Sequence, residues 1–146
     1  MAKMLFKAGE DYELKLSQLA AGSDKIAKKA IYEAAAIVAD RIKWNLADVL
    51  SGDSTGALWE SLGIAPILQD NDGNWGTKIG FDGYSGKPYK GFPKGTPNQL
   101  KARVLESGRS GQTKKPFVRP AVNMTHDQAV AKMRRVIEEE IKKLDL

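Results

Sequence analysis

The spacing of apolar side chains divides the chain into two helical regions that flank a middle region of strands and loops. Across residues 26–49, apolar side chains recur every three or four positions, which predicts a long helix lying across a sheet. A coiled-coil seam is the alternative. Alanines at positions 34–36 leave room for a second element to approach closely. Ser23 or Asp24 is suited to cap this helix, after a shorter helix that stops near Gly22.

The C-terminal region repeats the helical spacing and ends near Lys143. Two starting points are open for this helix. Pro120 suits a first turn, whereas Thr125 begins a capping box that Gln128 completes. The predicted apolar face consists of Val130, Met133, Ile137, Ile141 and Leu144.

Alternating apolar and polar residues predict two strands between the helical regions, at residues 62–68 and 75–81. Asp72-Gly73 lies between them and favours a hairpin turn. Pro66 places the first strand at a sheet edge or a bulge, because proline cannot donate to a ladder. Such an edge is open to pairing with another subunit. Met4-Leu5-Phe6 predicts a further short strand or an arm.

These elements predict one α+β domain over residues 1–146. Its long N-terminal-half helix and its C-terminal helix pack on a small antiparallel sheet. A hydrophobic fraction of 42% with 28% charged residues is ordinary for a soluble globular domain. The absence of cysteine excludes disulfides and thiolate chemistry. No apolar run is long enough to cross a membrane, so no membrane partner is expected.

Glycine and proline recur every few residues between positions 83 and 97, with Tyr84, Tyr89 and Phe92 among them. Glycine frees the backbone and proline removes a donor, so this composition predicts a long loop. After the loop, Thr96 and Gln99 form a capping box at the start of a short helix. Gly108 is expected to close that helix in the left-handed conformation.

The positive charge is concentrated in residues 83–121. This stretch holds nine cationic side chains and one carboxylate, Glu106, for a net charge of +8, whereas the whole chain carries +5. The first interpretation of this localised charge is a solvated loop whose charge aids solubility. The alternatives are a contact with phosphates that does not read sequence and a contact with a neighbouring protein. The side chains expected to contact DNA are Lys87, Lys90, Lys94, Arg109, Lys114 and Lys115.

Three short patterns resemble catalytic, metal-binding or phosphate-binding motifs, and each lacks a feature that its motif requires. Ser54 lies in a Gly-x-Ser-x-Gly pattern with His126 downstream, but a helix precedes it where a nucleophile elbow needs a strand. Asp70 and Asp72 have calcium-loop spacing, but Trp75 occupies the position that needs glycine. The order Lys-Gly-Thr at positions 94–96 is not that of a phosphate-binding loop. The sequence therefore predicts no enzyme, no cofactor and no metal site.

Two motifs carry a resemblance to a known family. Val104-Leu105-Glu106-Ser107-Gly108 is followed, after a short basic gap, by Pro116-Phe117-Val118-Arg119-Pro120-Ala121 and an amphipathic C-terminal helix. This order resembles the neck, or tail-component, proteins of long-tailed double-stranded DNA phages, which are encoded among the head–tail joining genes. Ser54-Thr55-Gly56-Ala57-Leu58 after a long helix agrees with the resemblance. The loop at residues 83–97 is longer than the commoner family pattern.

The resemblance implies a structural protein of the virion or a prophage, present in the host cytoplasm during assembly. It implies a ring, for example a hexamer, between the head-closure or connector protein and the tail-terminator protein. Passing double-stranded DNA would meet the basic loop without being read in sequence. The expected assembly contacts are Phe117, Arg119, Pro66, Tyr89 and Phe92. The alternative functions are a basic nucleic-acid-binding accessory protein and, less favoured, a small hydrolase.

Overall fold

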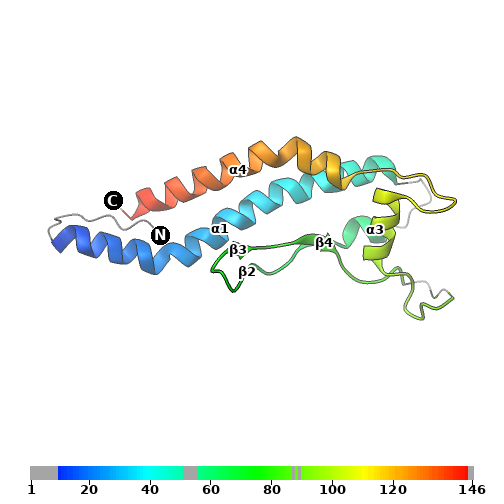
Figure 1. Cartoon of the computed structure of the whole chain (residues 1–146), viewed down its shortest axis with the longest axis horizontal. Coiled ribbons are helices and arrows are strands. Elements are labelled where there is room, and N and C mark those ends of the chain that lie inside the picture. Colours follow the sequence, from blue (N-terminus) through cyan, green and yellow to red (C-terminus); the bar gives the residue numbers. More distant parts are fainter. Residues whose placement is uncertain (1–9, 51–55, 87, 89, 145–146) are drawn as a thin grey trace.

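Two long antiparallel helices form an elongated rod, and the shorter elements gather along one half of it (Figure 1). The computed structural model describes residues 10–50, 56–86, 88 and 90–144. Helix α1 (Glu10–Val49) has 40 residues and α4 (Val118–Lys143) has 26. At about 1.5 Å per residue, α1 is about 60 Å long. The predicted α+β architecture is confirmed.

Contacts at both ends of α4 fix its antiparallel packing on α1. Near the start of α4, the Asn45 side chain donates a hydrogen bond to the Phe117 carbonyl oxygen at 3.3 Å. Near its end, Lys29 Nζ donates to Glu140 Oε1 at 2.6 Å. The helix–helix interface is lined by small side chains, which permit a close approach. The buried alanines of the two helices are Ala30, Ala34, Ala35, Ala121 and Ala129.

The predicted break near Gly22 is wrong, because α1 runs without interruption from Glu10 to Val49. A glycine inside a helix costs only about 1 kcal/mol relative to alanine, and the good helix formers on both sides outweigh that cost. Ser23 and Asp24 therefore lie inside the helix and do not cap it.

Of the two predicted starts of the last helix, the one near Pro120 is confirmed and the one at Thr125 is wrong. Helix α4 begins at Val118, so Pro120 lies in its first turn. Thr125 lies within the helix, where its hydroxyl donates to the Ala121 carbonyl oxygen at 2.7 Å. The predicted apolar face is partly wrong as well, because Val130 and Ile137 are 37% and 39% exposed. The smaller side chains of the neighbouring face pack against α1 instead.

The two predicted strands form an antiparallel pair, but each is interrupted in its middle. Residues 65–67, which include Pro66, and residues 77–78 lie between the paired segments. Across the gap, the Thr77 hydroxyl donates to the Ala65 carbonyl oxygen at 2.6 Å. The paired segments are β1 (Leu62–Ile64) with β4 (Ile79–Phe81), and β2 (Leu68–Gln69) with β3 (Trp75–Gly76).

The turn between β2 and β3 has the predicted hairpin chemistry. Asp70 Oδ1 accepts hydrogen bonds from the backbone N–H groups of Asp72 and Asn74, at 2.9 and 2.8 Å. Gly73 has φ 84°, a left-handed value that glycine adopts at no steric cost. The Asp70 carboxylate therefore stabilises the turn.

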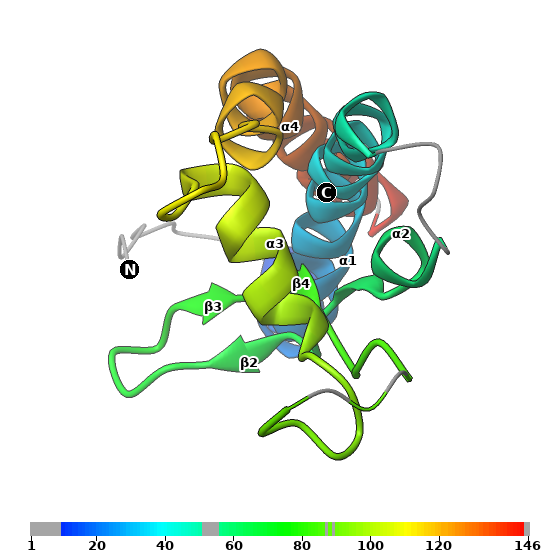
Figure 2. The same cartoon turned by 90° about the vertical axis from the view of Figure 1, so that its right-hand side faces the viewer.

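The core lies at one end of the rod, where α1 and α4 meet the sheet and the two short helices (Figure 2). Helix α2 (Ala57–Glu60) contributes Leu58, and α3 (Asn98–Ser107) contributes Ala102. The rings of Phe81 and Phe117 meet edge to face, with centroids 5.9 Å apart. The fully packed cluster consists of Ile42, Leu46, Leu58, Ala102, Phe117 and Ala121.

Candidate functional site

The basic segment of the sequence forms one end of the molecule, which we call the basic end (residues 83–121). Figure 1 shows its two loops and α3 at the end opposite the start of α1 and the finish of α4. Viewed along the rod in Figure 2, the loops lie on either side of α3. The chain therefore separates a basic surface from the start of α1 and the end of α4.

The first loop of the basic end is closed at its base. Tyr84 pairs with Pro97 in an antiparallel bridge, and the Ser85 N–H donates to the Thr96 carbonyl oxygen at 2.9 Å. Asn98 is 3% exposed, and its side chain donates to the Asp82 carbonyl oxygen at 2.9 Å. These contacts connect both ends of the loop to the start of α3, so the loop projects from a fixed base.

The predicted capping box at Thr96 is wrong. Helix α3 begins at Asn98 with Pro97 as its N-cap, and no side chain caps it. Gln99 Oε1 instead accepts a hydrogen bond from the Phe81 backbone N–H at 3.4 Å. This contact connects α3 to β4.

The second loop is a tight turn after α3. Arg109 and Gln112 exchange two backbone hydrogen bonds, of 3.1 and 2.9 Å. Gly108 has φ 75° and ψ 175°, so its φ is positive as predicted but its ψ is extended and not left-handed helical. A Cβ atom at Gly108 would lie 3.0 Å from both the Gln112 carbonyl oxygen and the Lys114 nitrogen. Glycine is required here by both conformation and space.

Glu106, the single carboxylate of the basic end, connects α3 to the first turn of α4. Its oxygens accept hydrogen bonds from the N–H groups of Phe117, Val118 and Arg119, at 2.7, 2.8 and 3.0 Å. Burial alone would raise the pKa of Glu106, but these three donors and the Arg119 charge outweigh it, and the pKa lies below its usual value. A carboxylate at a helix N-terminus also complements the helix dipole.

Five of the six predicted DNA-contact side chains are exposed in the structure. None of them forms an ion pair with a described carboxylate. The Glu106 oxygens are held by backbone donors, so the positive charge of this end stays available to solvent. The sixth side chain, Lys87, lies outside the described residues. The exposed five are Lys90, Lys94, Arg109, Lys114 and Lys115.

The predicted assembly contacts have different surroundings. Phe117 is 0% exposed, so it is the hydrophobic anchor of its segment but is not part of the surface. It is held inside because Pro116 is followed directly by the first turn of α4, which Glu106 fixes over the core. Arg119 and Pro66 are exposed and Phe92 is half-buried. Tyr89 lies outside the described residues.

The described residues of the weaker chemical patterns form no catalytic or metal-binding group. His126 is exposed on α4, with Nδ1 3.3 Å from Asp127 Oδ1, and Ser54 lies outside the described residues. No group of three metal-ligating side chains gathers within the described part of the chain. Among the described helices, none has the length and hydropathy of a membrane span.

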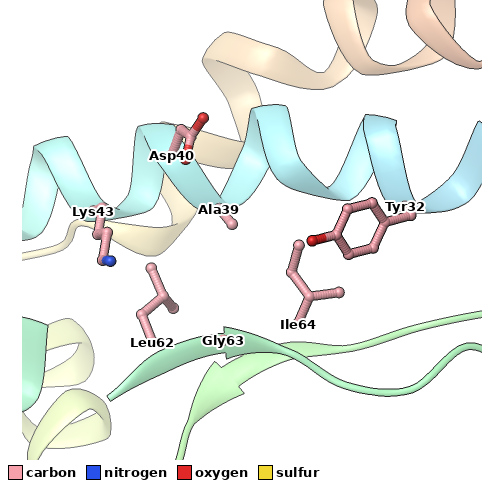
Figure 3. Close-up of a pocket in the computed structure, with 7 residues that line it drawn as sticks. All are labelled: Tyr32, Ala39, Asp40, Lys43, Leu62, Gly63 and Ile64. Atoms are coloured by element: carbon pink, nitrogen blue, oxygen red, sulfur yellow. The ribbon is translucent and has the colours of Figure 1, made fainter. Parts of the chain in front are cut away.

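An open depression of about 260 Å³, which no sequence pattern predicted, lies between α1 and β1 (Figure 3). Side chains of α1 form one wall, among them Tyr32, Ala39 and Lys43. Leu62 and Ile64 project from β1 toward α1 and form the other wall. Small-molecule pockets usually enclose about 300–1,000 Å³, so this open depression is small for such a ligand.

No family model, curated protein or solved structure matches this chain. The resemblance carried by residues 104–121 therefore stays a prediction. The geometry gives its motifs a physical role, because Glu106, Gly108 and Phe117 together fasten α3 to α4.

Proposed function

We propose that this chain is a non-catalytic assembly protein of the phage neck type, which forms a ring at the head–tail junction. The observation that carries the proposal is the basic end, whose net charge is +8 and whose one carboxylate is used internally. A folded body that presents unpaired cations at one end suits contact with a polyanion. The motif order of residues 104–121 adds the resemblance to neck proteins.

The mechanism follows from charge and symmetry. A heterologous contact whose rotation closes produces a ring. If each copy turns its basic end toward the central channel, lysine and arginine side chains face the phosphates of passing DNA. Such contacts are blind to sequence, because phosphates carry no base information. They also weaken with salt, since binding releases condensed counterions.

Electron microscopy of the concentrated protein in negative stain tests the proposal. We expect closed rings of uniform size. Particles that stay single or grow only into open filaments would contradict ring assembly.

The exposed cations also favour a second candidate, an accessory protein that binds nucleic acid as a monomer. A gel-shift titration separates the two candidates. Tight and steeply salt-dependent binding by the monomer favours the accessory protein, whereas feeble binding by the monomer favours assembly.

Removing three lysines from the basic end should weaken its contact with DNA and leave the fold intact. In the variant Lys90→Ala, Lys94→Ala, Lys114→Ala, we expect the slope of log affinity against log salt to fall by about 3 for double-stranded DNA. The measurement is a fluorescence titration of the assembled protein between about 50 and 200 mM salt.

The matched control removes the same charge from the other end of the rod, through Lys25→Ala, Arg135→Ala and Lys142→Ala. All three side chains are exposed. An equal loss of slope in this control would show that total charge governs binding and that the basic end does not.

A further inference from the structure

The outer edge of β1 carries backbone groups for which the described part of the chain supplies no partner. Hydrogen bonds join Ser61 to Asp82 and Ala65 to Lys78, at 3.0 and 2.8 Å. Bonded pairs alternate along an antiparallel ladder, so Gly63 is the next residue that faces β4. The N–H and C=O groups of Leu62 and Ile64 therefore point away from β4. Within the described residues, no hydrogen bond reaches these four groups.

The opposite edge of the same sheet is covered. Helix α3 lies beside β4, and Gln99 accepts the hydrogen bond of the Phe81 N–H that points outward there. Only the β1 edge borders the depression of Figure 3, where Gly63 is exposed. The adjoining hollow is mixed, since Leu62, Ile64 and Ala39 line it together with the charged Asp40 and Lys43. An open edge of three residues beside such a hollow is suited to receive a short extended segment by strand addition.

We propose that residues Met4-Leu5-Phe6 of a second copy of this chain add to the outer edge of β1 as an antiparallel strand. The segment lies outside the described residues, and its sequence is the short apolar stretch that predicts a strand or an arm. With Leu5 opposite Gly63, the donated segment meets all four open backbone groups of Leu62 and Ile64. Antiparallel pairing is also the commoner arrangement of neighbouring strands.

The alternation of side chains agrees with this register. Met4 and Phe6 would lie on the sheet face of Leu62 and Ile64, which points toward α1. There they would fill the depression lined by Tyr32, Ala39 and Lys43. Leu5 would lie on the other face, beside the bare backbone of Gly63. A donated segment thus covers the open edge of β1 together with the side chains of Leu62 and Ile64.

Chain length excludes the copy's own segment as the occupant. Helix α1 is continuous from Glu10, and the first lining residue of the depression is Tyr32. These residues are about 33 Å apart along the helix axis at 1.5 Å per residue. Phe6 and Glu10 are four positions apart in the sequence, so their Cα atoms are separated by at most about 14 Å. The segment must therefore come from a second copy.

This inference rests on the proposed function, because strand donation would supply the contact between neighbouring subunits of the ring. Each copy donates one segment and accepts another through a different surface, which is a heterologous contact. Repetition of that contact closes a ring when the rotation permits.

Engineered cysteines test the register, because the natural chain contains none. Leu5→Cys and Gly63→Cys in one chain place two thiols opposite each other across neighbouring copies. Directly opposite residues whose groups do not bond each other have Cα atoms about 4.5 Å apart, within the range that disulfides span. A side chain at Gly63 would meet no atom within 4 Å, so the fold tolerates the change.

We expect disulfide-linked dimers and longer ladders on non-reducing gels, and their reversal by reductant. The matched control is Leu5→Cys with Gly76→Cys, because Gly76 is exposed in β3 and equally free of neighbours. Pairing raises the effective concentration of the thiols, so the Gly63 variant should cross-link at least about tenfold faster than the control. Equal rates in the two variants would overturn the proposal.

The same samples are viewed by electron microscopy, which separates this inference from the proposed function. If rings form but the Gly63 variant cross-links no faster than the control, strand donation is overturned and ring assembly is not. Cross-linked ladders without rings support strand donation and contradict ring assembly. If neither ladders nor rings form, both strand donation and ring assembly are overturned.

Discussion

Phe117→Ala should lower the free energy of unfolding by about 3–5 kcal/mol, which is the usual range for a buried phenylalanine. Phe117 is 0% exposed, and its ring meets Phe81 edge to face at a centroid distance of 5.9 Å. Its removal leaves a cavity among Leu46, Leu58 and Ala121, which belong to α1, α2 and α4. Urea denaturation measures this loss of unfolding free energy. The unfolding is monitored by circular dichroism at a concentration where the chain is monomeric.

Phe92→Ala is the control for this experiment. Phe92 is also an aromatic residue of the basic end, but its side chain is only half-buried. We expect its replacement to cost about 1 kcal/mol, since less apolar area leaves contact with the protein. A loss of the same small size for Phe117→Ala would show that the segment after Pro116 does not anchor in the core.

Glu106→Gln should destabilise the protein by about 2 kcal/mol at neutral pH, comparable to the loss of a strong helix cap. The carboxylate accepts three backbone hydrogen bonds at the start of α4, and a neutral amide has only one acceptor oxygen. The melting temperature should fall by about 6 °C for a chain of this size. Calorimetry measures both quantities.

Acid should abolish the difference in stability between the natural chain and Glu106→Gln. The pKa of Glu106 is lower in the folded chain than its usual value, so its stabilising effect is complete above the unfolded pKa. The effect is lost as the pH falls through the folded pKa. The stability gap between the natural chain and Glu106→Gln should therefore narrow below about pH 4.3, the usual value for glutamate.

The matched control for the carboxylate is Glu139→Gln. Glu139 is exposed on α4, so its replacement should change stability by less than about 0.5 kcal/mol at any pH. A gap between the natural chain and Glu106→Gln that stays constant from neutral to acid pH would contradict the role assigned to the Glu106 charge.

The sequence was sufficient for the architecture because the apolar spacing of the helices extends over many turns. It was less informative where one residue can serve two roles. Gly22 resembles a helix end, but the flanking residues carry α1 through it. Gln99 matches a capping box, but its side chain bonds to Phe81 in β4. Both outcomes depend on tertiary contacts that local patterns do not encode.

The role of Glu106 was missed for a related reason. Its partners are backbone N–H groups 11 to 13 positions away, and every residue type except proline carries one. The usable signal was its isolation, since Glu106 is the only carboxylate among nine cations in residues 83–121. The depression beside β1 was likewise hidden, because Tyr32 and Lys43 lie off the apolar face of α1 that the spacing defines.

The residues that carry the resemblance to neck proteins have structural roles in this chain. Glu106 fixes the first turn of α4, Gly108 permits the turn that follows α3, and Phe117 fills the core. Together they hold the two basic loops at one end of the rod. The function that we propose depends on this placement, because charge acts on DNA only from a surface that faces it.

A three-dimensional reconstruction of the assembled protein by electron cryomicroscopy tests the central claim most directly. We predict a closed ring whose inner rim is formed by the basic end, with Lys90, Lys94, Arg109 and Lys114 facing the channel. A ring with these side chains on its outer surface, or particles that form no closed ring, would contradict the account.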